Sequence, residues 1–302
     1  MDGELLSWKR VYQVVRRVGR GRKPMVRRGA PDRYTTEDVA LWLLWAAWRN
    51  QPVSRVLISG LSLRMHRLVG FPLPATVPTP STLCRRRKRP DFQAFMQSVL
   101  RRLRTRLRPK TKHCLIDSTP LPVGRLSHDP DARLGFNRLR GYRWHTLVSA
   151  DQIVLAEEVA PANVAELTIA RTLVGRARQH GLSVRWLVGD AGYDSEPLHR
   201  LVAEQLGRAR LIAKVNDRGY ELRFTKTPLR ARMHREWQRP IIQRTLHERG
   251  EIERLYSVLK SSQFGLYGLP PWVRRTQRVA EWLQLKTVIY HSNLLAQRKI
   301  AA

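Results

Sequence analysis

The sequence predicts an α/β protein in which a mixed sheet, covered by helices, follows a mostly helical N-terminal region. Helical apolar spacing and basic clusters dominate residues 1–110, whereas short apolar strands joined by tight turns begin at residue 113. From residue 164 onward, strands and amphipathic helices alternate, which is typical of a mixed sheet with helices on its faces. A length of 302 residues agrees with two domains, 1–110 and 111–302.

Three helices are predicted in the N-terminal region. The first opens with the cap and acidic turn at 36–38 and continues as an apolar run to Trp48, so it belongs to a core. The second is capped at 81–82 and stops at Pro90, and the third covers 91–108 with apolar residues at helical spacing. The body of the second helix is a basic run, which we expect to contact DNA phosphates: Arg85, Arg86, Arg87 and Lys88. The alternative is that these four side chains form a solvent-exposed helix face without a phosphate partner.

The second part of the chain begins with three strands and continues with strands and helices in turn. The strands are expected at 113–123, 141–150, 152–160, 184–188 and 211–215. The second and third of these form a hairpin that turns at 150–152. The helices are expected at 164–180, 196–206, 250–260 and 276–298.

The net charge of the chain indicates the class of molecule that it binds. There are 56 Lys and Arg against 24 Asp and Glu, which gives a net charge of +32. This excess favours a polyanionic partner, and nucleic acid is the first candidate. The basic segment 216–243 is expected beside DNA.

Several other classes of protein are disfavoured. The longest apolar run, 39–48, is too short to span a membrane, and the first residues lack the pattern of a secretory signal. The two cysteines are far apart, which argues against a disulfide framework or a thiolate zinc site. No phosphate-binding loop motif is present, so no nucleotide cofactor is expected. We expect a cytoplasmic protein that associates with the nucleoid when it is bound to DNA.

Three acidic residues stand where a protein with few carboxylates has no structural need for them. Asp117 interrupts an apolar strand, Asp190 follows another, and Glu253 lies on a predicted helix. Carboxylates on two strands and a helix can converge at a sheet edge, where their oxygens hold Mg²⁺ or Mn²⁺, as in two-ion phosphoryl transfer. The alternative for each is a capping, turn or ion-pairing role.

Four segments in their order along the chain carry a family resemblance. They are Leu-Ile-Asp-Ser-Thr at 115–119, Gly-Tyr-Arg-Trp-His at 141–145, Gly-Asp-Ala-Gly-Tyr-Asp-Ser at 189–195, and the stretch 249–260. Together they resemble bacterial insertion-sequence transposases of the DDE class over about residues 110–295. The resemblance implies an RNase H-like catalytic domain, in which Asp117, Asp190 and Glu253 hold two divalent ions. It also implies a DNA-binding N-terminal domain.

A finer signature surrounds the third acid. Many of these transposases carry Tyr, Arg, Glu and Lys at fixed spacing, and Arg249, Glu253 and Lys260 match it, whereas the tyrosine position is Leu246. By resemblance, Arg249 and Lys260 hold DNA phosphates near the cut. A salt bridge between Arg249 and Glu253 one turn away is the alternative for the arginine. His145 is expected to pack in the hairpin rather than to contact DNA.

The resemblance implies metal-dependent cleavage at element ends, followed by attack of the freed 3′-hydroxyl on target DNA. The expected partners are the terminal inverted repeats, the target DNA, and a second copy of the chain in a homodimer or larger assembly. One alternative is a DNA-binding protein that derives from such an element and is no longer catalytic. The other is a metal-dependent nuclease of the same fold that cuts without joining.

Overall fold

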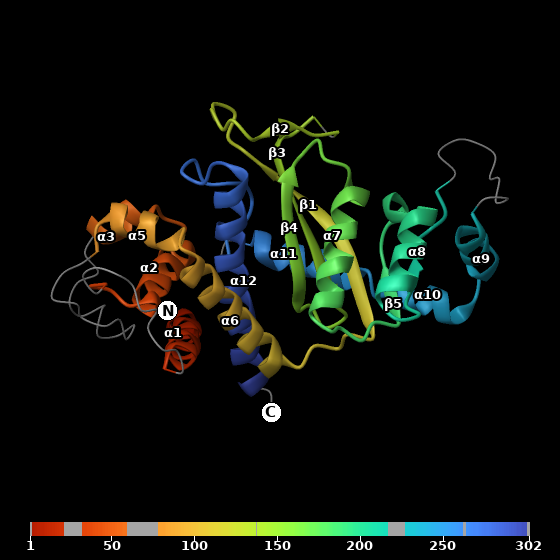
Figure 1. Ribbon diagram of the computed structural model, residues 1–302, viewed down its shortest axis with the longest axis horizontal. Coiled ribbons are helices and arrows are strands. Elements are labelled where there is room, and N and C mark those ends of the chain that lie inside the picture. Colours follow the sequence, from red (N-terminus) through yellow and green to blue (C-terminus); the bar gives the residue numbers. More distant parts are fainter. Residues whose placement is uncertain are drawn as a thin grey trace. The chain divides into compact units, whose positions relative to one another are not determined.

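The fold is that of a computed structural model, and it describes residues 2–20, 32–58, 78–136, 138–216, 227–261 and 264–300. The chain divides into two compact units, one of residues 1–108 with 281–302 and the other of residues 109–280. The sequence predicts a boundary at 110, close to this division, but it assigns residues 281–302 to the second domain. Helix α12 (Thr276–Ile300) begins in one unit and ends in the other (Figure 1).

The first unit is helical, as the sequence predicts. It contains α1 (Asp2–Gly19), α2 (Thr36–Trp48), α3 (Val53–Ile58), α5 (Pro80–Arg87), α6 (Pro90–Leu107) and the end of α12. Every residue of α2 from 39 to 47 is buried, which explains why this helix is apolar all round. The ring of Trp8 stacks on Trp48 and meets Trp45 edge-on, so α1 covers the end of α2.

The helix starts in this unit lie one or two residues before the predicted caps. Thr35, rather than residue 36, caps α2 and forms a capping box with Asp38. Thr79 caps α5, and Pro80 occupies the first turn, where its missing N–H leaves no hydrogen bond unmade. Among the described residues, no helix is long and apolar enough to cross a lipid bilayer.

The second unit is built on one mixed sheet. Its strands are β1 (His113–Pro122), β2 (Arg133–Leu134), β3 (Arg140–Ser149), β4 (Val154–Pro161), β5 (Trp186–Val188) and β6 (Arg210–Ile212). Strands β1, β3 and β4 are antiparallel neighbours, whereas β5 runs parallel to β1 and β6 runs parallel to β5. The short β2 pairs with the start of β3. This order of three antiparallel strands followed by two parallel ones is the RNase H-like sheet that the resemblance implies.

Helices cover both faces of the sheet. They are α7 (Glu166–Gln179), α8 (Glu196–Gln205), α9 (Pro228–Glu236), α10 (Pro240–His247) and α11 (Gly250–Lys260). Helix α7 lies over β3 and β4, and its Glu166 bonds to Arg143, whereas Tyr256 of α11 bonds to Thr146. Arg143 and Thr146 point to opposite faces because side chains alternate along a strand, so α7 and α11 lie on opposite faces of the sheet (Figure 1).

Candidate active site at the edge of the sheet

The candidate site lies where one strand of the sheet stops short of its neighbour. Strand β5 ends at Val188, opposite Leu115 of β1, so β1 continues past it with a partner only on the β3 side. Asp117 lies on this part of β1, where it pairs with Thr146 of β3 and is beyond the last residue that pairs with β5. The chain after β5 turns through Gly189 and Asp190 beside the same edge, which explains why an acid interrupts one strand and follows the other.

The turn after β5 is held by Asp190 itself. Asp190 caps a short 3₁₀ turn, η1 (Ala191–Tyr193), because its Oδ1 accepts the backbone N–H of Gly192 at 2.8 Å. The turn-shaping role that sequence reasoning considers for Asp190 is therefore present. This role uses one of the two carboxylate oxygens, Oδ1.

The environment of Asp117 disfavours its charge. The pKa of this carboxyl is raised to about 6, chiefly by burial. The charges of Asp190 and Glu166 also raise it, whereas the Ser118 backbone N–H and Arg249 lower it. The N–H of Ser118 donates to Asp117 Oδ1 at 2.7 Å. Like charges held together in a partly buried place are typical of functional sites.

Helix α11 brings the third acid to this edge. Tyr256, which is buried, donates its hydroxyl to the backbone carbonyl of Asp117 at 3.0 Å, and the same hydroxyl lies 2.8 Å from the hydroxyl of Thr146. One turn before it, Glu253 faces a cavity of about 370 Å³ whose lining also includes Asp190. The helix that carries Glu253 is thus bonded directly to the residue that carries the first carboxylate.

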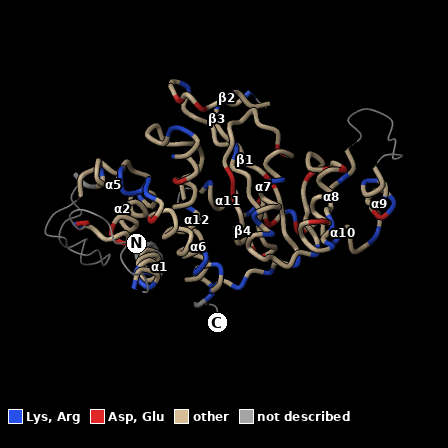
Figure 2. The backbone as a smooth tube through the Cα atoms, viewed as in Figure 1, with Lys and Arg blue, Asp and Glu red and all other residues tan. Residues whose placement is uncertain are grey.

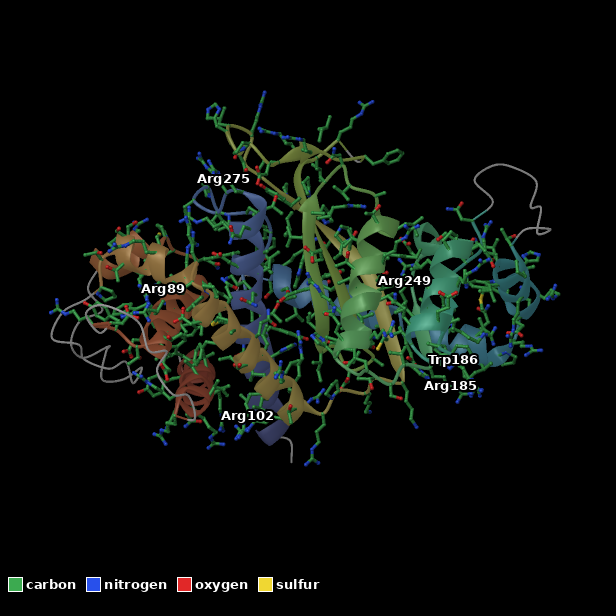
Figure 3. All side chains as sticks on the ribbon, viewed as in Figure 1. Arg89, Arg102, Arg185, Trp186, Arg249 and Arg275 are labelled. Carbon is green, nitrogen blue, oxygen red and sulfur yellow. The ribbon has the colours of Figure 1, made fainter. Side chains whose placement is uncertain are left out.

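The two basic residues of the signature lie near the same acids. Arg249, labelled in Figure 3, immediately precedes α11. It lines the cavity with Glu253 and lowers the pKa of Asp117. The charge of Asp117 in turn favours the charged form of Lys260, although burial lowers the pKa of this lysine. The structure therefore brings Asp190, Arg249 and Lys260 within electrostatic reach of Asp117.

Glu253 is the most exposed of the three acids. Its side chain is 61% exposed, and its carboxylate pairs with Arg249 at 3.3 Å, so the salt bridge that the spacing allows is present. In the described part of the chain, no three His, Cys, Asp or Glu side chains gather closely enough to hold a metal ion as they stand. The carboxylates of Asp117 and Asp190 are the donor chemistry that Mg²⁺ and Mn²⁺ require, and Glu253 lies on the wall of the adjoining cavity.

A comparison with protein families identifies the second part of the chain. The model of the transposase DDE domain family matches residues 108–290, more than half of the chain. The chain belongs to this family. The match begins at the division between the two compact units and includes all three acids, Arg249 and Lys260.

Two further comparisons were made with this transposase. No curated protein matches it. A solved cryo-EM structure of a piggyBac transposase synaptic complex with hairpin DNA is similar at 13% identity and a TM-score of 0.42, covering 97% of this chain and 74% of that one. A likeness this weak indicates nothing about substrate or mechanism.

Sequence reasoning missed one carboxylate beside the candidate site. Glu166, the first residue of α7, accepts the hydroxyl of Ser118 at 2.6 Å and the guanidinium of Arg143 at 2.5 Å. It also raises the pKa of Asp117. An acid in the first turn of a helix is ordinary because it suits the helix dipole, so nothing in the sequence distinguished it.

The basic run on α5 divides into two pairs of residues. Arg86 is buried, donates to the Tyr34 carbonyl at 2.8 Å and pairs with Asp32 at 3.0 Å, and Arg87 pairs with Glu281 at 3.0 Å. Arg85 and Lys88 are exposed. The run therefore combines two arginines that stabilise the helical unit with two cations that face solvent, as helical spacing dictates. Figure 2 shows the basic residues of α5 in blue.

Two other sequence expectations can be compared with the structure. His145 is buried, as expected, and burial together with Arg143 lowers its pKa to about 4. Of the segment 216–243, residues 217–226 lie outside the described residues. The rest forms α9 and part of α10, where Arg230 pairs with the buried Asp194 at 2.8 Å.

Proposed function

We propose that this transposase cleaves DNA at the ends of a mobile element and joins the freed 3′-hydroxyl to target DNA in a reaction that depends on divalent cations. One observation carries the proposal. Asp117 and Asp190 lie at the same unpaired edge of the sheet, and α11 brings Glu253 and Arg249 to the cavity beside Asp190. Acids from a strand, the turn after another strand and a helix thus support a site for a phosphodiester at this edge.

Asp117 and Asp190 are the proposed cation ligands, and Glu253 completes the set by leaving its ion pair with Arg249. Mg²⁺ or Mn²⁺, as two ions, would activate the attacking oxygen and stabilise the leaving one. The exposure of Glu253 supports this change because an exposed ion pair contributes at most about 1 kcal/mol. The released guanidinium of Arg249 then binds a DNA phosphate.

Lys260 is proposed to bind the same DNA strand through its ammonium group. Within the helical unit, we propose Arg85 and Lys88 as the phosphate contacts of α5, since Arg86 and Arg87 are engaged in ion pairs. Double-stranded DNA, both as element ends and as target, is the proposed partner, and a homodimer or larger assembly is proposed because two ends must be brought together.

The test uses DNA that carries the natural flanks of the gene, incubated with purified protein in Mg²⁺ or in EDTA, with strand ends mapped. We expect cleavage at a defined flank that requires Mg²⁺ and is lost in Asp190→Asn. Glu204→Gln is the matched control, because Glu204 is exposed on α8, away from the cavity lining, and its substitution removes the same charge. Full metal-dependent cleavage by Asp190→Asn would contradict the assignment.

The products separate the proposal from its alternatives. Joined products support a transposase, whereas metal-dependent cleavage without joining supports a nuclease of the same fold. Binding without cleavage in both Mg²⁺ and Mn²⁺ supports a DNA-binding derivative that is no longer catalytic.

A further inference from the structure

The two carboxylate oxygens of Glu166 have different surroundings. Oε1 accepts both the Ser118 hydroxyl and the Arg143 guanidinium. Oε2 faces the turn after β5, where it would lie 3.1 Å from a Cβ placed on Gly192, and Asp190 Oδ1 would lie 3.0 Å from the same point. Glu166 therefore reaches β1 next to Asp117 with one oxygen and the Asp190 turn with the other.

Gly192 is what lets the two acids approach the turn together. A methyl group at this position would lie closer to both carboxylate oxygens than ordinary van der Waals contact allows. No left-handed backbone conformation requires glycine here, since Gly192 is not among the positive-φ residues. The absence of a side chain is thus explained by the close approach of Asp190 and Glu166.

Stability alone does not explain this placement. Glu166 is 21% exposed, and its charge opposes the ionisation of Asp117. A carboxylate that served only to pair with Arg143 could do so at a greater distance from the partly buried carboxylate of Asp117. Its contacts instead join three elements of the site: β1, β3 and the turn after β5.

We propose that Glu166 is a positioning residue of the cation site: it holds the β1 segment of Asp117 through Ser118 and limits the position of the Asp190 carboxylate across Gly192. This inference rests on the proposed function. Residues that orient metal ligands typically change metal affinity or activity by about 10-fold to 100-fold when they are replaced.

The test measures Mn²⁺ affinity by titration without DNA, together with kcat and KM for cleavage. We expect Glu166→Ala to weaken Mn²⁺ binding by about tenfold or more and to lower kcat with little change in KM. Glu166→Gln keeps an oxygen that can accept from Ser118, so we expect it to recover part of this loss. Glu204→Ala, an exposed change on α8, should leave both quantities unchanged.

Gly192→Ala tests the same geometry without removing Glu166. The added methyl should displace one of the two carboxylates and weaken Mn²⁺ binding, and this measurement decides the case if Glu166→Ala fails to fold. If Glu166→Ala and Gly192→Ala fold and keep a Mn²⁺ affinity and a kcat within twofold of the wild-type values, the inference about Glu166 is overturned and the proposed function is not. A wild type that binds Mn²⁺ through Asp190 but cleaves no DNA would overturn the proposed function alone.

Discussion

Replacing Asp117 with Asn should abolish cleavage and at the same time stabilise the metal-free protein. The pKa of Asp117 rises from 3.8 to about 6 in the folded chain, chiefly because the carboxylate is buried. At neutral pH the ionised form is therefore disfavoured by folding. Asn keeps the shape and the oxygen that accepts the Ser118 N–H, but it carries no charge.

The magnitude follows from the change in pKa. One pKa unit corresponds to about 1.4 kcal/mol, so ionised Asp117 lowers the free energy of unfolding by up to about 3 kcal/mol above pH 6. This penalty falls by about half at pH 5 and disappears below the unfolded pKa of 3.8, where Asp117 is protonated in both states. For a unit of this size, each kcal/mol changes the melting temperature by about 2 to 4 °C.

The assay is denaturation in EDTA at pH 7.5 and at pH 5, with wild type, Asp117→Asn and Asp194→Asn. Asp194 is a control of opposite sign, because His199 and Arg230 lower its pKa and its charge stabilises the fold above pH 3.8. We expect Asp117→Asn to melt higher than wild type at pH 7.5, by a smaller margin at pH 5, and Asp194→Asn to melt lower. An Asp117→Asn protein no more stable than wild type at pH 7.5 would refute the reasoning.

Three other predictions concern a buried hydrogen bond, a buried lysine and two exposed cations. Tyr256→Phe removes the partner of the Asp117 carbonyl and of the Thr146 hydroxyl. It should lower the free energy of unfolding by about 1 to 3 kcal/mol, measured by urea titration, and reduce kcat. Unchanged values would count against the bond from Tyr256 to β1. Burial lowers the pKa of Lys286 to about 7, so the free energy of unfolding of the wild type should rise by about 2 kcal/mol between pH 7 and pH 9 as this lysine loses its charge. An equal rise in a Lys286→Met protein would show that Lys286 is not its origin. Replacing Arg85 and Lys88 with Ala should reduce the slope of log affinity against log salt concentration by about 2 in DNA-binding titrations. Arg86→Ala should mainly destabilise the helical unit, because Arg86 pairs with Asp32. A slope that is unchanged in the double variant would exclude Arg85 and Lys88 from phosphate contact.

Much of the fold was readable from local patterns. The apolar run of α2, the hairpin of β3 and β4 and the bounds of α11 depend on spacing and turn residues within a few positions, so the sequence predicted each of them. Element ends were less predictable. Strand β5 begins at Trp186 rather than 184, because the strand lasts only as long as β1 and β6 pair with it.

Asp117 and Asp190 were also visible in the sequence, because a carboxylate within or directly after an apolar strand is unusual. Glu253 was visible through its place in the signature on the predicted helix. The sequence could not show the contacts between residues distant along the chain. The bond from Tyr256 to the Asp117 carbonyl spans 139 positions, and the bond from Glu166 to Ser118 spans 48.

The sequence by itself determined the mixed sheet, the helical N-terminal region, the basic charge and the order of the acids, since each follows from local pattern or composition. Only the tertiary structure decided that β5 stops short of Asp117, that Glu166 faces Asp190 across Gly192, and that Arg86 faces Asp32 rather than solvent. The physical reason is that burial and charge–charge distance depend on which elements pack together, and packing involves residues that no local pattern connects.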